Sequence, residues 1–408
     1  MPPEDKLPTA RELVEGYLAP LARSAALAPR IRYGARITAI SRAGHDKVKT
    51  TGREGSSFVL RVRTGQGHEE VRASAVIDAS GTWSQPSPLG IHGLPALGEA
   101  EQRSRISYGM PDILGAARKR FAGRKVLVVG AGHSAAGNLL SLATLADEAP
   151  DTRIVWAVRG TDLRRLFGGG ESDGLPARGE LGTRMRSLVE AGRLEVHLGF
   201  GIHEIAQTST GLRIEPEDAS RGVIEGVDEI VAATGSRPDL GMLRELRLSL
   251  DPWLESTQAL APLIDPNEHS CGTVRPHGHR ELAHPEPGFY AIGAKSYGRA
   301  PNFLMATGYE QARSVVAALA GDLVAADQVQ LELPATGVCS ADLAGADPTN
   351  GSASGCCGGP AKDTSAACCA LDEARKAEGA AGCGCGPAPT ARAPVSAAPV
   401  SARAACCG

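Results

Sequence analysis

The chain has few aromatic residues and no long hydrophobic run. Phe, Trp and Tyr together make up 4% of its 408 residues. No apolar stretch approaches the roughly 20 residues that cross a bilayer as a helix, so a membrane protein is not expected. The first residues, MPPEDKLPTA, have neither the basic nor the apolar segment of a secretory signal. A cytoplasmic location is therefore the expectation.

A strong net charge is also missing. The formal charge is −3 at pH 7, so the composition does not indicate nucleic acid or an anionic membrane as a partner. Cysteine is scarce over most of the chain: of ten cysteines, only Cys271 and Cys339 lie outside the stretch from Cys356 to Cys407. In a cytosolic chain of this length, metal or metalloid binding and redox chemistry are more typical uses of cysteine than disulfides.

The most informative stretch is Lys125 to Gly137, KVLVVGAGHSAAG. Its apolar run is typical of a strand buried on both faces. Gly130 permits a tight turn, Gly132 lets backbone N–H groups approach a pyrophosphate, and Ala135 keeps the following helix close to the sheet. The N-terminus of that helix attracts an anion. The order strand, turn, helix predicts a dinucleotide site, rather than an ordinary glycine-rich turn, at Gly130, Gly132, His133, Ser134 and Ala135.

Strands and helices alternate around this motif. We expect helices at Leu7–Leu27, Glu180–Ala191 and Leu304–Leu319, and strands at Ile31–Ser41, Phe58–Thr64, Val71–Ser80, Arg153–Arg159, Leu194–Phe200, Arg213–Glu217 and Val227–Ile230. The first helix is expected to have Thr9 as its N-cap and Glu12 as its capping-box partner. The alternation predicts an α/β fold with a doubly wound parallel sheet.

The end of the second expected strand indicates which nicotinamide nucleotide binds. Sites for NAD usually carry an acid there, which binds the ribose hydroxyls. This strand ends instead in Arg159, with Arg164 and Arg165 close behind. A cation suits the 2′-phosphate of NADPH, so NADPH is the expected cofactor; the alternative is a solvated basic turn.

Three strands run into turns of small residues. Val71–Ser80 leads into Gly81 and Thr82, Val227–Ile230 leads into Thr234 and Gly235, and a short apolar strand leads into Gly293. Such turns let a flat ligand lie against the backbone; the alternative is an ordinary loop. After Gly293, the loop Ala294–Asn302 offers candidate polar groups at Lys295, Tyr297 and Arg299.

The segment from Asp265 to His284 contains four histidines and one cysteine: His269, Cys271, His277, His279 and His284. Imidazole and thiolate both bind zinc, but this spacing matches no standard zinc site. Structural or substrate-lining histidines are the preferred interpretation.

From Pro334 onward the composition changes to Ala, Gly, Pro and Ser, which predicts a disordered tail over residues 334–408. Closely spaced cysteines occur at Cys356, Cys357, Cys368, Cys369, Cys383, Cys385, Cys406 and Cys407. Adjacent cysteines are poorly placed to form a disulfide with each other, but paired thiolates chelate soft ions well. We expect these cysteines to bind arsenite or another thiophilic ion, rather than to have clustered by chance.

Val76–Trp83, Lys125–Gly137, Asp228–Leu240 and Gly288–Asp322 together resemble the flavin-containing monooxygenase branch of the two-dinucleotide flavoproteins, most closely those encoded with arsenic-resistance genes. The resemblance covers roughly Leu7 to Asp322. It implies two Rossmann-like domains: an FAD domain at residues 1–120 and 241–325, and an inserted NADPH domain at 121–240. It also implies FAD contacts at Ser80, Gly81, Thr82, Gly293 and Asn302, and NADPH contacts at Gly130, Gly132, Ser134, Arg159, Thr234 and Gly235. The ending Ala405-Cys406-Cys407-Gly408 is similar to the mercury-binding arm of mercuric reductases.

The chain departs from this family in three ways. No GxGxxG motif for FAD precedes Ala79, so the FAD domain is expected to be short at its N-terminus. The FxGxxxH fingerprint has no match between Tyr108 and Phe121. Lys295 follows Gly293 and Ala294 where related flavoproteins carry an acid. No CxxC lies in the nucleotide domain, which argues against a thioredoxin-reductase mechanism.

The expected function is that of a flavoprotein oxidoreductase, in which NADPH reduces FAD, acting on a small molecule in arsenic or soft-metal resistance. The catalytic residues are not identified. Two alternatives stay open: a metalloid-binding carrier or sensor with a degenerate nucleotide fold, and a metal reductase resembling mercuric reductase, in which Cys271 receives the ion.

Overall fold

The computed structural model describes residues 8–167, 176–268 and 274–331. The chain separates into two compact units, Met1–Ala346 and Asp347–Gly408, and the second unit lies outside the described residues. Within the described ranges, no helix has both the length and the apolar character of a membrane span.

A five-stranded parallel sheet confirms the α/β fold class. The strands are β5 (Ile106–Tyr108), β6 (Lys125–Val129), β7 (Arg153–Val158), β8 (Glu195–Leu198) and β12 (Glu229–Ala232), in the order β5-β12-β6-β7-β8. From β6 the chain proceeds outward to β7 and β8, and it then returns to the other side of β6 as β12. This reversal between β6 and β12 is the position at which open α/β sheets bind ligands, beside the carboxyl ends of the strands.

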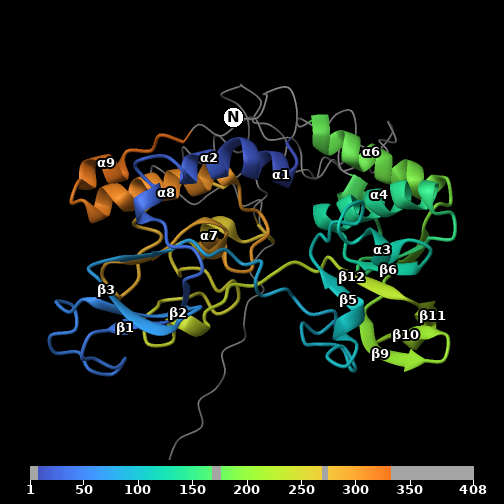
Figure 1. Ribbon diagram of the computed structural model, residues 1–408, viewed down its shortest axis with the longest axis horizontal. Helices are drawn as coiled ribbons and strands as arrows, with labels where there is room; N and C mark the ends of the chain where they lie inside the picture. Colours follow the sequence, from blue (N-terminus) through green and yellow to red (C-terminus); the bar gives the residue numbers. More distant parts are fainter. Residues whose placement is uncertain (1–7, 168–175, 269–273, 332–408) are drawn as a thin grey trace, which may run out of the picture. The chain divides into compact units, whose positions relative to one another are not determined.

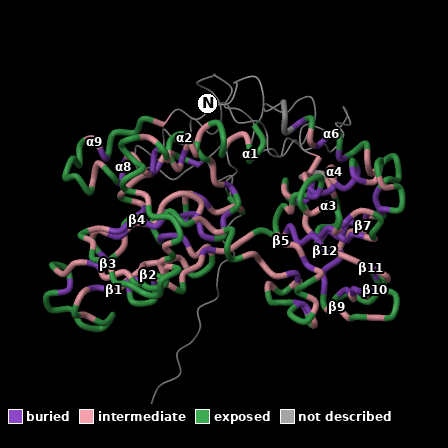
Figure 2. The backbone as a smooth tube through the Cα atoms, in the orientation of Figure 1, coloured by how far each residue is buried: buried purple, intermediate pink, exposed green. Residues whose placement is uncertain are grey.

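The sheet is covered on both faces, as a parallel sheet requires. Helices α3 (Arg118–Phe121), α4 (His133–Glu148), α5 (Arg164–Phe167) and α6 (Pro176–Glu190) follow its strands, and the antiparallel strands β9 (Ile202–Thr208), β10 (Gly211–Pro216) and β11 (Ile224–Val227) form a small second sheet. Figure 1 shows α4 and α6 on one side of the sheet and β9–β11 on the other. Alternate residues of β6 and β7 pack into one apolar core or the other, which accounts for the burial of Val126–Val129 and Ile154–Val158 (Figure 2).

The N-terminal part begins with a helical segment: α1 (Ala10–Leu13), a π-helical turn (Val14–Leu18), α2 (Ala19–Ala22) and a 3-10 turn (Ala28–Arg30). The expected capping box is confirmed, because Thr9 accepts the N–H of Glu12 while the Glu12 carboxylate accepts the N–H of Thr9. Three antiparallel strands follow: β1 (Arg36–Arg42), β2 (Phe58–Thr64) and β3 (Gly67–Ala73). The expectation that the first strand begins at Ile31 is wrong, because Gly34 turns the chain with a φ of 67°.

The expected single strand Val71–Ser80 is in fact two strands. Val71 belongs to β3, and β4 (Val76–Asp78) pairs in parallel with β13 (Phe289–Ala291). The chain then continues from β13 through a 3-10 turn (Gly293–Tyr297) to α8 (Met305–Leu319) and α9 (Leu323–Asp327); the short helix α7 (Ala261–Ile264) precedes β13. The 3-10 turn replaces the first half of the loop expected at Ala294–Asn302.

Strand β5 belongs to the five-stranded sheet although it precedes the expected domain boundary at residue 120. Its residues Ile106 to Tyr108 pair in parallel with Ile230 to Ala232 of β12. Leu89, Ala96 and Ile106 pack into the same apolar core as Leu127 and Val129. The packed unit around the dinucleotide motif therefore begins near Leu89.

Candidate functional site

The carboxyl edge of the five-stranded sheet brings together the predicted dinucleotide residues. Gly130 directly follows β6, and Gly132 is the N-cap of α4, which begins at His133. Gly130 has a φ of 129°, and a Cβ atom there would lie 2.3 Å from the carbonyl oxygen of Ala233. Gly130 is thus required by the fold itself, because no larger residue fits between β6 and the end of β12.

Gly132 is different, because no described residue requires a glycine at this position. A Cβ atom at this position would meet no atom within 4 Å, and the backbone has an ordinary φ of −92°. No side chain in the described part of the chain caps the first turn of α4, so the N–H groups of this turn keep their capacity to bind an anion. The open space and free donors fit a pyrophosphate group at Gly132, His133, Ser134 and Ala135.

Trp156 on β7 is a site residue that the sequence analysis missed. Its indole Nε1–H donates to the carbonyl oxygen of Gly130 at 2.8 Å, and the ring is completely buried. The N–H of Gly130 donates to Ala157 at 3.1 Å. The turn is therefore attached to β7 through both polar groups of Gly130, a connection between distant residues that no sequence signal reveals.

Arg159 directly follows β7, at the carboxyl edge of the sheet, as predicted. Its side chain is exposed and forms no hydrogen bond or ion pair with the residues that the structure describes. The guanidinium is therefore available to an anionic ligand beside the turn. The side chains of Arg164 and Arg165 lie outside what the structure describes.

The turns after β4 and β12 lie side by side. Thr234 donates its hydroxyl to the carbonyl oxygen of Ser87 at 2.6 Å, and the N–H of Ser87 donates to Gly235 at 2.9 Å. The hydroxyls of Thr82 and Ser236 are 2.8 Å apart. The Thr234 hydroxyl is thus engaged within the protein, whereas its neighbour Gly235 has a φ of 86° and open space beside it.

A second group of predicted residues lies at the carboxyl ends of β4 and β13. Gly81 and Gly293 both have a φ of 69°, and a Cβ atom at Gly293 would meet nothing within 4 Å. The N–H of Gly293 donates to Gln311 of α8 at 2.7 Å. Beneath these turns, Nζ of Lys295 lies 2.6 Å from Oδ2 of Asp78 and 3.1 Å from the Ser80 hydroxyl.

This second edge fits part of an FAD molecule. The small residues at Ser80, Gly81 and Gly293 leave backbone against which a flat ring system can lie. In the described ranges, however, no third parallel strand with a glycine-rich turn and a helix stands beside β4 and β13. The residues present therefore supply a surface for the ring, and no second cradle for a pyrophosphate.

Three of the predicted polar groups in this region point elsewhere. Asn302 is buried and donates to the carbonyl oxygen of Ile264 at 3.1 Å; its role as an FAD contact stays a prediction. Tyr297 is buried among His277 and Phe303. Arg299 pairs with Glu255 at 3.0 Å.

The described histidines of the 265–284 segment each contact a different partner. His277 contacts Gln311 through Nε2 at 2.9 Å, and burial lowers its pKa. His279 pairs with Asp327 at 2.9 Å. His284 accepts the N–H of Ser249 through Nδ1 at 3.3 Å, and burial lowers its pKa to about 4. Among the described residues no three potential ligands gather in a metal site; His269 and Cys271 lie outside them.

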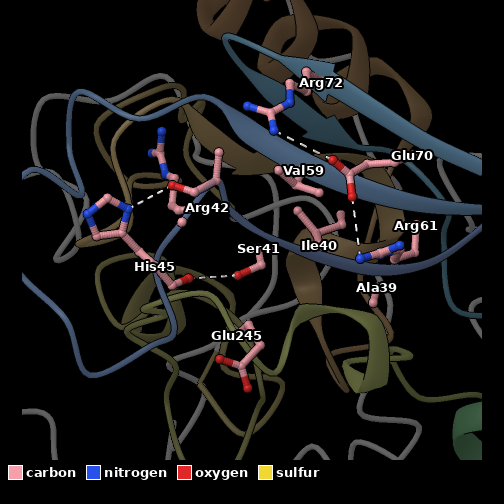
Figure 3. A pocket seen from close by; sticks show the side chains of 12 residues that line it. Ala39, Ile40, Ser41, Arg42, His45, Val59, Arg61, Glu70, Arg72 and Glu245 are labelled. Atoms are coloured by element: carbon pink, nitrogen blue, oxygen red, sulfur yellow. Dashed lines mark hydrogen bonds and ion pairs between the residues drawn. The ribbon is translucent and has the colours of Figure 1, made fainter.

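A cavity of about 440 Å³ lies elsewhere, against strands β1, β2 and β3. Figure 3 shows Glu70 between Arg61 and Arg72, with Arg42, His45 and Glu245 around the same hollow. The Glu70 carboxylate is 3.3 Å from Arg61 and 3.7 Å from Arg72, and both arginines are well exposed. None of the predicted cofactor residues lines this cavity, so it is not the candidate site.

The tail cysteines Cys356, Cys357, Cys368, Cys369, Cys383, Cys385, Cys406 and Cys407 lie outside the described residues. Their expected role in binding a thiophilic ion stays a prediction.

Comparisons with known proteins give a distant likeness. No protein-family model and no curated protein sequence matches the chain. The chain is similar to the crystal structure of L-lysine 6-monooxygenase from Pseudomonas syringae (19% identity, 79% and 77% of the two chains, TM-score 0.49). It is also similar to the bacillithiol disulfide reductase of Staphylococcus aureus (12% identity, 77% and 75% of the two chains, TM-score 0.49). A third similar structure is the FAD-bound cadaverine monooxygenase DfoA of Erwinia amylovora (13% identity, 76% and 74% of the two chains, TM-score 0.48). A likeness of this degree assigns the chain neither a family nor an activity.

Proposed function

We propose that this protein is an oxidoreductase that binds NADPH at the carboxyl edge of its five-stranded sheet and uses it to reduce FAD. The observation that supports this most is the turn between β6 and α4. Gly132 is exposed there, and no described residue requires a glycine at this position. Arg159, whose side chain pairs with no described residue, follows the adjacent strand β7.

Each part of this edge has a role in binding the nucleotide. The first N–H groups of α4 bind the pyrophosphate, and Arg159 binds the 2′-phosphate through charge-assisted hydrogen bonds. Gly235, which follows β12, borders the switch point between β12 and β6, where the nucleotide continues towards its nicotinamide. Gly132 keeps the approach free of side chains.

The flavin is placed at the carboxyl ends of β4 and β13. Ser80, Gly81, Thr82 and Gly293 present backbone to the ring system, and the buried pair of Asp78 and Lys295 holds the two turns together from beneath. When bound, NADPH supplies a hydride and FAD accepts it; this chemistry belongs to the cofactors, while the protein orients them and excludes water.

The physiological role that we propose is resistance to arsenic or another soft metal. The support is the close spacing of the tail cysteines, since neighbouring thiolates are good ligands for thiophilic ions. The tail would capture the ion, and the nucleotide-binding part would carry out the redox reaction on a small molecule.

The test uses the purified full-length protein. We expect NADPH to bind with a stoichiometry of one by calorimetry, and added FAD to acquire a protein-bound absorption spectrum that NADPH bleaches in the absence of oxygen. A protein that binds NADPH but never FAD would contradict the flavin part of the proposal. A colourless protein that binds arsenite and no nucleotide would be a metalloid carrier, and the enzyme proposal would then be wrong.

A further inference from the structure

The indole of Trp156 is a buried group that contacts the turn of the proposed pyrophosphate site. Trp156 lies in the middle of the covered sheet, directly opposite Val128 of β6, and none of its surface is exposed. The other two tryptophans, Trp83 and Trp253, are 83% and 79% exposed. A buried indole usually needs an acceptor for its N–H, and here the acceptor is the Gly130 carbonyl at 2.8 Å.

This hydrogen bond fixes the orientation of one peptide group. Within the described residues, Trp156 is the partner of the Gly130 carbonyl oxygen, which is thereby held towards β7. The peptide between Gly130 and Ala131 is trans, so its N–H points away from its C=O. The N–H of Ala131 therefore points away from β7, and Ala131 is exposed at the start of the open turn.

The other hydrogen bonds at this end of β6 that the described residues make join backbone groups. The N–H of Gly130 donates to Ala157 at 3.1 Å, and the N–H of Ala233 donates to Val129 at 2.9 Å. These bonds fix where β6 ends, but neither involves the carbonyl oxygen of Gly130 or the N–H of Ala131. Among the described residues, the indole is the group that hydrogen-bonds to this next peptide.

We propose that Trp156 is a positioning residue for dinucleotide binding: its indole N–H sets the Gly130–Ala131 peptide so that the turn presents its N–H groups to the pyrophosphate. The inference rests on the proposed function, because it concerns the same nucleotide site. It differs from the role of Arg159, because the pyrophosphate is common to NADPH and NADH whereas the 2′-phosphate is not.

The test compares Trp156→Phe with the wild type, and Trp253→Phe is the matched control for loss of an exposed indole. Phe keeps most of the ring packing and removes the donor. We expect the dissociation constants of NADPH and NADH to rise by the same factor, about three- to tenfold, the size expected for loss of one neutral hydrogen bond. Adenosine 2′-phosphate, which has no pyrophosphate, should bind both proteins equally.

Equal affinity of Trp156→Phe and the wild type for both dinucleotides would overturn the inference. A parallel loss of affinity for all three ligands, together with a large fall in melting temperature, would also overturn it, because that is the signature of a purely structural residue. A wild type that binds no dinucleotide would instead refute the proposed function, so the two failures are distinguishable.

A second measurement does not depend on the stability of Trp156→Phe. In a Trp83→Phe/Trp253→Phe background, Trp156 gives the one indole ¹⁵N–¹H resonance of the chain. Saturating NADPH should shift this resonance, whereas adenosine 2′-phosphate should leave it in place. A resonance that does not respond to NADPH in a protein that binds NADPH would refute the positioning role.

Discussion

Lys295 and Asp78 form an ion pair in the interior, with Nζ and Oδ2 2.6 Å apart and side chains only 1% and 3% exposed. Lys295 follows β13 and Asp78 ends β4, so the pair joins the carboxyl ends of the two parallel strands. Removing one charge leaves the other buried without compensation. We expect Lys295→Met to lower the free energy of unfolding by about 3–5 kcal/mol in urea denaturation.

The control for this prediction is the exposed pair of Arg299 and Glu255, 3.0 Å apart. Arg299→Met should lower the free energy of unfolding by less than about 1 kcal/mol, because solvent screens the charges of a surface pair. The double variant Asp78→Asn/Lys295→Met should recover much of the lost stability, since no unpaired charge remains. Equal stability of Lys295→Met and the wild type would show that the pair is not the contact that holds the two turns.

The two glycines of the dinucleotide turn should respond in opposite ways to alanine. Gly130→Ala should destabilise the fold by several kcal/mol, since its Cβ would overlap Ala233 and its φ of 129° is strained for alanine. Gly132→Ala should leave the melting temperature within a few degrees of the wild type and weaken NADPH binding at least tenfold. Calorimetric melting and NADPH titration measure the two effects. Unimpaired NADPH binding by Gly132→Ala would place the pyrophosphate elsewhere.

Arg159 should determine the preference for NADPH over NADH. Loss of a charge-assisted contact of about 1.5–3 kcal/mol corresponds to roughly a ten- to hundredfold loss of affinity. Arg159→Ala should therefore weaken the binding of NADPH by this factor and leave the affinity for NADH unchanged. Arg153→Ala is the matched control, because Arg153 is exposed at the opposite end of the same strand. An unchanged ratio of the two affinities in Arg159→Ala would exclude Arg159 from the site.

The free energy of unfolding should decrease at acidic pH because His284 is buried in its neutral form. Burial lowers the pKa of this imidazole from 6.5 to about 4, so the folded state favours the neutral form more than the unfolded state does. The contribution of neutral His284 to the free energy of unfolding is complete above pH 6.5 and is lost as the pH falls towards 4. Roughly 2 kcal/mol of this contribution is lost by pH 5. The free energy of unfolding, measured by urea denaturation, should differ less between pH 7.5 and pH 5 for His284→Gln than for the wild type. A difference of the same size in both proteins would assign the acid sensitivity to other groups, of which buried His277 is the first to test.

The tail cysteines should bind arsenite independently of the nucleotide site. Replacing the eight cysteines from Cys356 to Cys407 by serine should abolish most bound arsenic, as measured by mass spectrometry, and leave NADPH affinity unchanged. The double variant Cys271→Ser/Cys339→Ser is the control and should retain arsenic. Binding should weaken as the pH falls well below the thiol pKa of about 8.5, because the thiolates are the ligands. Retention of arsenic by the eightfold variant would move the binding site to Cys271.

Four strands of the five-stranded sheet, β6, β7, β8 and β12, could be predicted because their segments are largely apolar, and the turn after β6 could be predicted because glycines mark it. Burial on both faces of a sheet produces a run of apolar residues in the sequence, whereas the choice of neighbouring strand leaves no local pattern. The short strand β5 has three residues and no distinct pattern, and it was not predicted. The division between β3 and β4 was missed because VRASAVIDAS reads as one continuous strand.

The candidate site was predictable where a sequence pattern marks it. Backbone geometry dictates Gly130, Gly132 completes the glycine pattern of a dinucleotide turn, and Arg159 follows from its place at the end of β7. The hydrogen bond from Trp156 to Gly130 joins residues that are 26 positions apart. The pairing of Lys295 with Asp78 likewise depends on the parallel register of β4 and β13, which the sequence does not encode locally. Side-chain contacts across strands therefore required the structure.

The place of β5 in the sheet has a consequence for any attempt to excise the nucleotide-binding part as an independent fragment. A fragment beginning at residue 121 would lack β5, so the edge of β12 from Ile230 to Ala232 would be stripped of its partner. It would also lose Leu89, Ala96 and Ile106 from one apolar core. An uncovered apolar edge strand promotes aggregation. A fragment that keeps its own core and a paired edge must therefore start before Leu89, about forty residues upstream of the turn that defines it.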